Sequence, residues 1–256
     1  MTIRLSVIVI TKNEAHNIRE CLESVHWVDE IIVVDANSSD GTVQICAEYA
    51  NQVVVTEDWP GFGLQKNRAL DLVTGDWVLS LDADERVSEE LGAEIRSILS
   101  KEPAFKVFEL PRLSSFCGKP IHHGDWWPDY VTRLFRRGTT RFTEVPVHES
   151  LDYTGPRGRL QGLLHHLSII SLEQMQGKIT HYTSAGAKAM RARGRKGGLW
   201  PAITHSLWAF FRGYVLRRGF LDGREGFMIA VSGAESTYYR YLKLMYLDRE
   251  KLADAR

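Results

Sequence analysis

The sequence predicts an α/β fold with a doubly wound, mostly parallel sheet and a C-terminal helical extension rich in basic and aromatic residues. Up to about residue 100, short apolar runs rich in β-branched residues alternate with segments of helical spacing. Repeated strand–helix units of this length imply a parallel sheet with right-handed crossovers and helices on both faces. The 256 residues are 44% hydrophobic and 25% charged, which is ordinary for a globular protein and argues against disorder.

The strands of the first half are short apolar runs of the kind that is buried in a parallel sheet. They are expected at residues 5–10, 31–34, 53–55 and 77–81. Apolar residues at helical spacing predict the intervening helices: one that contains Ile18 and Val25, one that follows the turn at 38–41, and two at 64–73 and 88–100. Ser88 and the two glutamates after it suit the start of the last helix.

The second half has a different pattern. Residues 106–110 and 130–135 are predicted strands with a long irregular loop between them, and residues 140–170 are short extended pieces interrupted by Pro and Gly. After Ser171 the chain is expected to be helical, with a basic, glycine-rich link before Trp200. We therefore expect two domains: residues 1–170, which contain the predicted sheet, and residues 171–256, which contain the C-terminal helices.

Cysteine usage and hydropathy restrict the cellular setting. The three cysteines are widely spaced and form no CxxC pair, which fits a reducing compartment and neither a disulfide framework nor a zinc site. The first five residues lack the layout of a signal peptide. No uninterrupted apolar stretch reaches the length of a membrane span. These features predict a cytoplasmic protein.

Charge is distributed unevenly along a chain whose formal net charge is zero. The 48 residues between Glu173 and Asp222 contain no acid and nine Lys or Arg residues, so the rest of the chain sums to −9. The same stretch is rich in Trp, Phe and Tyr, which predicts that it faces an anionic partner. Nucleic acid is not expected, because the aromatics have helical spacing and no nucleic-acid motif accompanies them.

Polar residues follow three of the predicted strands. Thr11, Asn13 and Glu14 follow the first strand, Asp35 ends the second, and Asp82, Asp84 and Glu85 follow the strand at 77–81. In sheets of this class, ligands bind at the carboxyl ends of the strands. These side chains therefore predict one binding site at one sheet edge.

Asp82 and Asp84 are candidate metal ligands, although a solvated strand end would also account for them. Two positions apart in extended backbone, their side chains are expected to point the same way. Hard carboxylate oxygens suit Mg²⁺ or Mn²⁺, which keep waters and take further ligands from a diphosphate. Because the acids follow a strand of the predicted sheet beside other polar strand ends, we favour the metal site.

Asp35 is a candidate contact for a base or ribose. Ser39 or Asp40 is expected to cap the next helix, whereas Asp35 lies further ahead and is expected to be free for a ligand. The first loop lacks the G-x-G-x-x-G and P-loop patterns, so the sequence supports neither a classical dinucleotide-binding fold nor a P-loop.

Four segments in order resemble the family 2 glycosyltransferases, which have the GT-A fold: "SVIVITKNEAHNIRECLESV", "DEIIVVDANSSDGT", "GFGLQKNRAL" and "GDWVLSLDADERV". This resemblance covers residues 3 to about 100. Later segments, including "VTRLFRR", "PVHESL" and "LLHH", resemble the lipopolysaccharide inner-core β-1,4-glucosyltransferase branch. Many members have two acids where this chain has Asp35-Ala36. The contact with the nucleotide at this position would therefore depend on Asp35 alone.

The resemblance implies an inverting, metal-assisted transfer of a hexose from a nucleotide-diphospho-sugar such as UDP-glucose. Asp82 would contact the ribose and Asp84 the metal, with His148, His165 or His166 completing the metal or diphosphate contacts. Lys66 would be able to reach a phosphate. The residues implied around the nucleotide-sugar are Thr11, Asn13, Glu14, Asp35, Gln65, Lys66 and Asp82.

Single displacement with inversion needs a base that takes the proton of the acceptor hydroxyl. Glu149 is favoured because its "HE" element stands where the resembling family has its acceptor-side acid. Asp129 is the alternative. Read alone, Glu149 would be a surface acid and His148 a core histidine.

Two regions are candidates for contact with the acceptor or a membrane. Trp126 and Trp127 lie in the irregular loop and could stack on a sugar, or could simply plug the sheet edge. A helix that begins near Trp200 would gather Trp200, Leu207 and other apolar residues on one face. Such a face is expected either in a protein core or at a membrane interface. The basic link contributes Arg191, Arg193, Arg195 and Lys196.

Together these features predict a glycosyltransferase, peripheral on the inner face of the cytoplasmic membrane, that acts on a phosphorylated glycolipid of the lipopolysaccharide core. Polyprenyl phosphate or a polysaccharide is the alternative acceptor. A non-catalytic protein that binds nucleotide-sugar and docks on membranes is the alternative of a different class.

Overall fold

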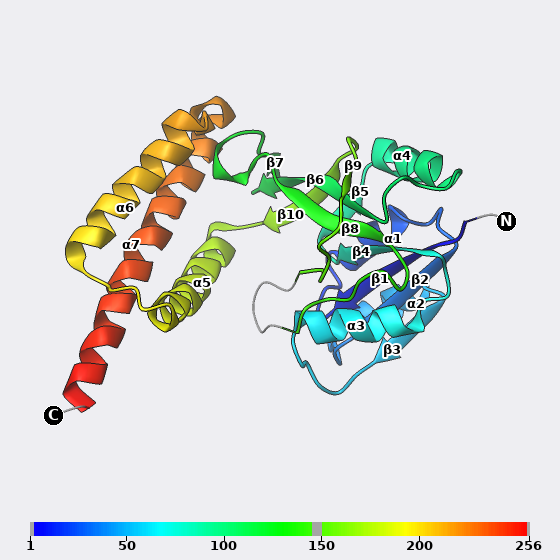
Figure 1. The fold of residues 1–256 in the computed structure, drawn as a ribbon, viewed down its shortest axis with the longest axis horizontal. Helices are drawn as coiled ribbons and strands as arrows, with labels where there is room; N and C mark the ends of the chain where they lie inside the picture. The colour runs from blue at the N-terminus through cyan, green and yellow to red at the C-terminus, as the bar shows by residue number, and fades with distance from the viewer. Residues whose placement is uncertain (1–2, 145–149, 255–256) are drawn as a thin grey trace. The chain divides into compact units, whose positions relative to one another are not determined.

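The computed structural model describes residues 3–144 and 150–254, and the chain divides into two compact units (Figure 1). The sheet unit consists of the chain up to Arg112 together with Asp129–His166. The helical unit consists of Leu113–Pro128 together with the chain from Leu167 onward. The irregular loop between the two predicted strands therefore belongs to the same unit as the C-terminal helices. A single boundary at residue 170 would assign this loop to the sheet.

Four parallel strands form the part of the sheet that carries the polar strand ends. Their order is β3 (Gln52–Val55), β2 (Glu30–Asp35), β1 (Leu5–Thr11), β4 (Trp77–Asp82). All seven residues of β1 are buried, because the strand has parallel neighbours on both sides. Thr11 pairs with Asp35 and Ile10 pairs with Asp82, so the carboxyl ends of β1, β2 and β4 are level.

Helices cover both faces of these strands, as strand alternation predicts. Val7 and Val9 of β1 point to a cluster that contains residues of α1 (Ile18–Glu23) and α4 (Glu89–Leu99). Ile8 and Ile10 point to the opposite face, where they pack with residues of α3 (Phe62–Leu72). The helix after β2 is α2 (Thr42–Ala47). The Ser88 hydroxyl accepts a hydrogen bond from the Leu91 amide, which confirms the predicted start of α4.

Strands from the second half of the sequence extend the sheet beyond β4. β8 (Tyr130–Arg136) is antiparallel to β4, and β6 (Val107–Phe116) is antiparallel to β8. β9 (Gly158–Arg159) pairs with β6, and β10 (Leu164–Ile169) lies between β6 and β5 (Glu85–Val87) in the strand order. The predicted α/β class is confirmed, with its parallel strands and its helical C-terminal region.

The helical unit is built on α7 (Gly223–Asp254), which packs against α5 (Leu172–Ala192) and α6 (Leu199–Phe211). A π-helix, η2 (Arg212–Leu216), and a 3₁₀-helix, η3 (Gly219–Asp222), lead from α6 into α7. The unit also contains β7 (Lys119–Pro120) and the 3₁₀-helix η1 (Gly124–Trp126). Within the part of the chain that the structure describes, every helix is too short or too polar to cross a membrane.

Candidate functional site

The carboxyl ends of β1 and β2 are joined by Asp35. Its side chain is fully buried and accepts hydrogen bonds from the Thr11 hydroxyl at 2.7 Å and from the Ser38 amide and hydroxyl at 2.7 and 2.6 Å. The expectation that Asp35 is free for a ligand is therefore wrong for this structure. The carboxylate instead sets the shape of the two loops that follow β1 and β2.

These two loops hold each other through backbone–side chain hydrogen bonds. The Asn13 amide donates to the Ser38 hydroxyl at 2.7 Å, and the Asn13 side-chain oxygen accepts from the Ser39 amide at 2.9 Å. Asn13 has a φ of +55°, a conformation that Asn tolerates better than most residues. Its side chain is exposed. Asn13 therefore lies at the rim of the sheet edge, on a loop of defined shape.

Glu14 lies in the same loop and is half-buried. Burial raises the pKa of its carboxyl, and the negative charge of Asp84 raises it further, against a hydrogen bond from Asn17 that lowers it. The Glu14 amide donates to the Thr42 hydroxyl at 2.8 Å. Glu14 and Asp84 thus repel each other across the edge, which is the electrostatic condition that a bound cation relieves.

Asp82, at the end of β4, is held by two cations. Lys66 Nζ lies 2.9 Å from Asp82 Oδ1, and Arg133 of β8 donates to Asp82 Oδ2. Burial alone would raise the pKa of this carboxyl, but the charges of Arg133 and Lys66 outweigh it and hold the pKa well below its usual range. Lys66 is buried and bound to Asp82, so the expectation that it reaches a phosphate does not describe this structure.

Glu85 extends this ionic network into the core. It is fully buried, accepts from the Asp82 amide at 3.0 Å, and lies 2.7 Å from Arg133 NH2 and 3.4 Å from Arg112 NH1. Arg112 in turn binds Asp129, with Nε 2.9 Å from Oδ2. The protein's own cations therefore neutralise two of the three acids in this segment. The roles of Arg112 and Arg133 were not predicted from the sequence. For Arg133, the available signal was its position within the otherwise apolar strand of "VTRLFRR".

Asp84 is the third acid, and it has a different environment from Asp82. β4 ends at Asp82 and a turn occupies residues 83–84, so the expectation that both side chains lie on extended backbone is wrong. His166 Nε2 lies 3.3 Å from Asp84 Oδ2, which brings together two residues that the sequence named separately. In residues 3–144 and 150–254, no three His, Cys, Asp or Glu side chains form a cluster suited to a metal ion. Taken singly, the carboxylates of Asp84 and Glu14 are donors of the type that suits Mg²⁺ or Mn²⁺.

Gln65 lies in α3 beneath the site, and its side chain is not exposed at the site surface. The side chain is fully buried, donates to the Thr56 hydroxyl at 2.9 Å and accepts from Arg68 at 3.0 Å. Its neighbour Asn67 exchanges two hydrogen bonds of 3.0 Å with the backbone of Phe142. α3 thus joins the site to the segment that leads toward residue 145.

The other predicted residues are not brought to this edge by the described contacts. His148 and Glu149 lie outside the described residues. Trp126 and Trp127 belong to the helical unit, where Trp126 packs its ring against Phe116. The basic residues Arg191, Arg193, Arg195 and Lys196 are in the same unit, at the end of α5 and in the link that follows.

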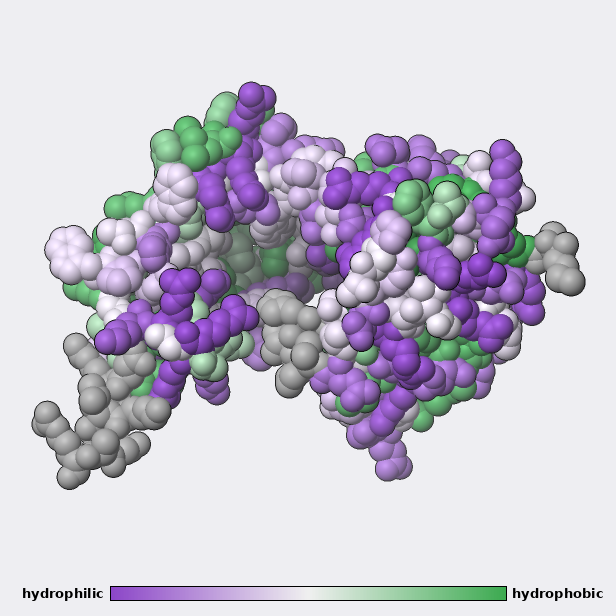
Figure 2. Space-filling view, in the orientation of Figure 1, coloured by the Kyte–Doolittle hydropathy of each residue, from purple (hydrophilic) through white to green (hydrophobic). Residues whose placement is uncertain are grey.

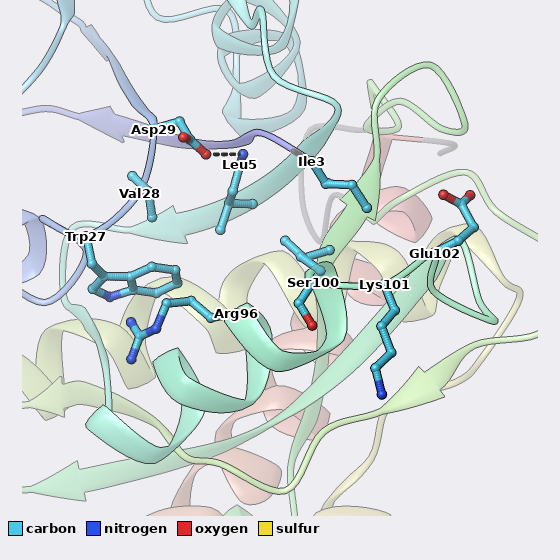
Figure 3. Close-up of a pocket in the computed structure, with 10 residues that line it drawn as sticks. Ile3, Leu5, Trp27, Val28, Asp29, Arg96, Ser100, Lys101 and Glu102 are labelled. Carbon is cyan, nitrogen blue, oxygen red and sulfur yellow. Dashed lines mark hydrogen bonds between the residues drawn. The ribbon is translucent and has the colours of Figure 1, made fainter. Parts of the chain in front are cut away.

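A pocket of about 460 Å³ lies elsewhere on the sheet unit (Figure 3). It is bordered by Leu5 at the start of β1 and by Arg96 and Leu99 near the end of α4. The Arg96 guanidinium stacks on the ring of Trp27. The central carbon of the guanidinium lies 4.7 Å from the ring centroid. Because the pocket adjoins the amino end of β1, it is distinct from the polar strand ends.

Comparison with known proteins places the site within a known family. The model of the family described as "Glycosyl transferase family 2" matches residues 6–145. An uncharacterized glycosyltransferase of Rickettsia prowazekii (strain Madrid E) is 31% identical over 259 residues, which cover 94% of this chain and 86% of the relative. The lipopolysaccharide core biosynthesis glycosyltransferase LpsC of Rhizobium meliloti (strain 1021) is 27% identical over 247 residues, covering 94% and 91%.

Solved structures show weaker overall similarity. S. aureus TarS 1-349 in complex with UDP-GlcNAc has a TM-score of 0.48 and 16% identity, covering 97% of this chain and 92% of that chain. Mannosyl-3-phosphoglycerate synthase from Rubrobacter xylanophilus has a TM-score of 0.48 and 18% identity, with 77% of each chain covered.

The family match includes the strand ends that form the site, from Thr11 through Asp35 to Asp84. It spans more than half of the chain, and the Rickettsia relative is similar over nearly all of it. The chain therefore belongs to glycosyl transferase family 2 and is a glycosyltransferase.

Proposed function

We propose that this enzyme transfers a hexose, with inversion, from a nucleotide-diphospho-sugar to a phosphorylated glycolipid of the lipopolysaccharide core or a related acceptor. The observation that carries the proposal is the arrangement at the end of β4. There Lys66 and Arg133 hold Asp82 as a fixed carboxylate, while Asp84 lies 3.3 Å from His166 and its negative charge raises the pKa of Glu14. This arrangement supports Asp82 as a hydrogen-bond acceptor and Asp84 as the proposed cation ligand.

The nucleoside is proposed to lie over the ends of β1 and β2. In this proposal Asn13, which is exposed, contacts the nucleoside directly, and Glu14 lies beside it. Thr11 and the buried Asp35 form the wall beneath, since their side chains bind each other. Gln65 and Lys66 fix the adjoining side from α3. Asp82 accepts a ribose hydroxyl through lone pairs that its two cations leave open.

A divalent metal, Mg²⁺ or Mn²⁺, is proposed to bind at Asp84. His148 and His166 are the proposed nitrogen ligands, and the supporting observation is the 3.3 Å separation of His166 from Asp84. When bound, such an ion supplies positive charge to the leaving diphosphate. The repulsion between Asp84 and Glu14 favours any cation that enters this edge.

Glu149 is proposed as the base that takes the proton of the acceptor hydroxyl, with Asp129 as the alternative. Asp129 is bound to Arg112, whose Nε and NH2 lie 2.9 and 2.8 Å from the same oxygen. An oxygen that already accepts two guanidinium N–H groups has less lone-pair capacity left for an acceptor hydroxyl. This contact supports Glu149 over Asp129.

The acceptor proposal depends on similarity to LpsC over nearly the whole of both chains. The basic and aromatic character of the helical unit also suits a phosphorylated lipid, with Trp126 and Trp127 as candidates for stacking on a sugar. Such an acceptor places the enzyme at the inner face of the cytoplasmic membrane. UDP-glucose is the donor that we propose to test first.

A screen of nucleotide-sugars with the purified full chain tests the proposal. Transfer to a lipopolysaccharide core acceptor is expected from one donor, to depend on Mg²⁺ or Mn²⁺, and to exceed hydrolysis without acceptor. Transfer only to polyprenyl phosphate or a polysaccharide would overturn the acceptor. Donor binding without any turnover would overturn catalysis in favour of a binding protein.

A further inference from the structure

The helical unit exposes a continuous apolar face along α6 and η2. Five large side chains on it are exposed, and we refer to them as the outer stripe: Trp200 (76%), Leu207 (66%), Trp208 (53%), Phe211 (45%) and Val215 (42%). Their spacing of three, four and seven residues places them on one side of the helix. Exposed apolar side chains gathered in this way mark an interaction site.

The opposite side of the same segment is already occupied. Phe210 stacks on Tyr214 with ring centroids 5.3 Å apart, and both rings contact Phe227 of α7, at 5.8 and 5.5 Å. The predicted single apolar face therefore divides into an inner part that packs on α7 and an outer part that does not. Core packing accounts for Phe210 and Tyr214, but it leaves the outer stripe unexplained.

Basic residues flank the stripe at both ends. Before α6, the link contains Arg193, Arg195 and Lys196, and all three are exposed. After α6, Arg212 and Arg217 bind Asp125 at 2.8 and 3.1 Å, and Arg218 is exposed. Residues 174–221 contain no acid. Figure 2 shows hydrophobic residues next to hydrophilic ones at the upper end of this unit.

We propose that the outer stripe lies in the headgroup region of an anionic lipid bilayer, with the exposed Arg193, Arg195, Lys196 and Arg218 bound to lipid phosphates. Tryptophan favours this depth of a membrane, and apolar helices with basic flanks lie in the interface. Since none of the described helices can span a bilayer, α6 lies along the surface. A second copy of the chain fits this face less well, because its basic flanks would meet like charges.

The inference concerns how the enzyme is held at its acceptor's membrane, and it extends the proposed function without depending on the donor or the base. Each Lys or Arg near an anionic surface contributes roughly 1 kcal/mol, which corresponds to about a fivefold increase in membrane affinity. Salt is expected to weaken the attraction, because it screens exposed charges.

Co-sedimentation of the full chain with vesicles is the test. Vesicles of phosphatidylcholine alone are compared with vesicles that also contain phosphatidylglycerol, at low and high salt. We expect strong pelleting only on the anionic vesicles, reduced by salt. Replacing Arg193, Arg195 and Lys196 with Gln should weaken it roughly a hundredfold if the contributions add.

The stripe itself is tested by Trp208→Ser with Phe211→Ser, which should weaken vesicle binding by roughly tenfold or more. The matched control is Tyr182→Ser with Tyr239→Ser, two aromatics outside the stripe with almost the same exposures, 51% and 44%. The control protein should bind vesicles as the unmodified chain does. Circular dichroism of both double variants verifies that the helices remain folded.

Equal pelleting on both kinds of vesicle, or none on either at low salt, would overturn the proposal. So would an equal loss in the control variant. Dimers in light scattering that Trp208→Ser with Phe211→Ser converts to monomers, together with absent vesicle binding, would assign the stripe to a second copy. Donor turnover is measured in parallel: turnover without vesicle binding defeats only the membrane proposal, and vesicle binding without turnover defeats only the proposed function.

Discussion

Lys66 Nζ lies 2.9 Å from Asp82 Oδ1, and the Lys66 side chain is only 2% exposed. Together with Arg133 on the other oxygen, it explains how an apolar strand can end in three closely spaced acids. Two of these acids, Asp82 and Glu85, are compensated by cations of the protein itself. The third, Asp84, lies 3.3 Å from His166, and it is the acid at which we propose the metal.

The buried ion pair predicts a large effect of Lys66→Met on stability. Lys66→Met leaves Arg133 to serve both Asp82 and Glu85, so these carboxylates are only partly compensated, and the free energy of unfolding should fall by roughly 3 kcal/mol. Urea denaturation followed by circular dichroism measures it. Arg68→Met is the matched control on the same helix, because Arg68 pairs with Asp58 at the surface. The control should lose little, and equal losses in the two variants would contradict the assignment.

Glu30 predicts a dependence of stability on pH. Its carboxylate is buried and accepts from the Thr74 amide at 2.9 Å, from the Thr74 hydroxyl at 2.7 Å and from the Ser6 hydroxyl. Burial raises the pKa of this group, but these hydrogen bonds outweigh it and lower the pKa below its usual value. A lowered folded-state pKa gives stability that is present above the unfolded value of about 4.3 and is lost as pH falls through the folded-state pKa.

Glu30→Gln should therefore be less stable than the unmodified protein at neutral pH, and the difference should shrink as the pH falls below about 4.3. Thermal unfolding across this pH range provides the comparison. Glu57→Gln removes one charge at an exposed position. Its melting temperature should change with pH in the same way as that of the unmodified protein. A difference for Glu30→Gln that stays constant with pH would show that its effect is not ionic.

The choice of base is tested by comparing two substitutions that keep the shape of the side chain. Glu149→Gln should lower turnover by about 10²–10⁴-fold, because it removes proton acceptance, while donor binding stays near normal. Asp129→Asn should change turnover less, since Asp129 is already bound to Arg112. Single-turnover rates and donor titrations separate the two effects. The reverse order of losses would transfer the role of base to Asp129.

Two glycines of α7 predict opposite effects of alanine. A Cβ at Gly226 would lie 1.8 Å from the Gly219 carbonyl oxygen, whereas a Cβ at Gly233 would meet no atom within 4 Å. Gly226→Ala should destabilise the turn into α7. Gly233→Ala should stabilise the protein by up to about 1 kcal/mol, because alanine favours helix over glycine. Thermal denaturation of both variants checks the pair, and a stable Gly226→Ala protein would mean that η3 can move away.

The strand ends could be predicted from sequence because they depend on local patterns. Apolar runs that end in Thr11, Asp35 and Asp82 place these residues on one edge once parallel pairing is assumed, and the register confirms it. Ser88 was identified for a similar reason, since an N-cap depends only on the next few residues. Local patterns therefore predicted most of the parallel half of the sheet.

The partners of these residues could not be predicted, because they are distant in the chain. Arg133 reaches Asp82 across 51 positions, and His166 pairs in β10 opposite Glu85. Asp35 was predicted to be free because its spacing says nothing about Thr11, which is 24 residues away and binds it. Such contacts follow from strand order, which hydrophobic periodicity does not encode.

We propose that this sheet edge binds a nucleotide diphosphate through a metal held by Asp84. Calorimetric titration of UDP into the full chain, with Mn²⁺ and with a chelator, tests this binding. We predict that Mn²⁺ strengthens UDP binding by the unmodified protein and has no such effect on Asp84→Asn, which should remain folded. Equal strengthening in both proteins, or equal binding with and without Mn²⁺ in the unmodified protein, would contradict the claim.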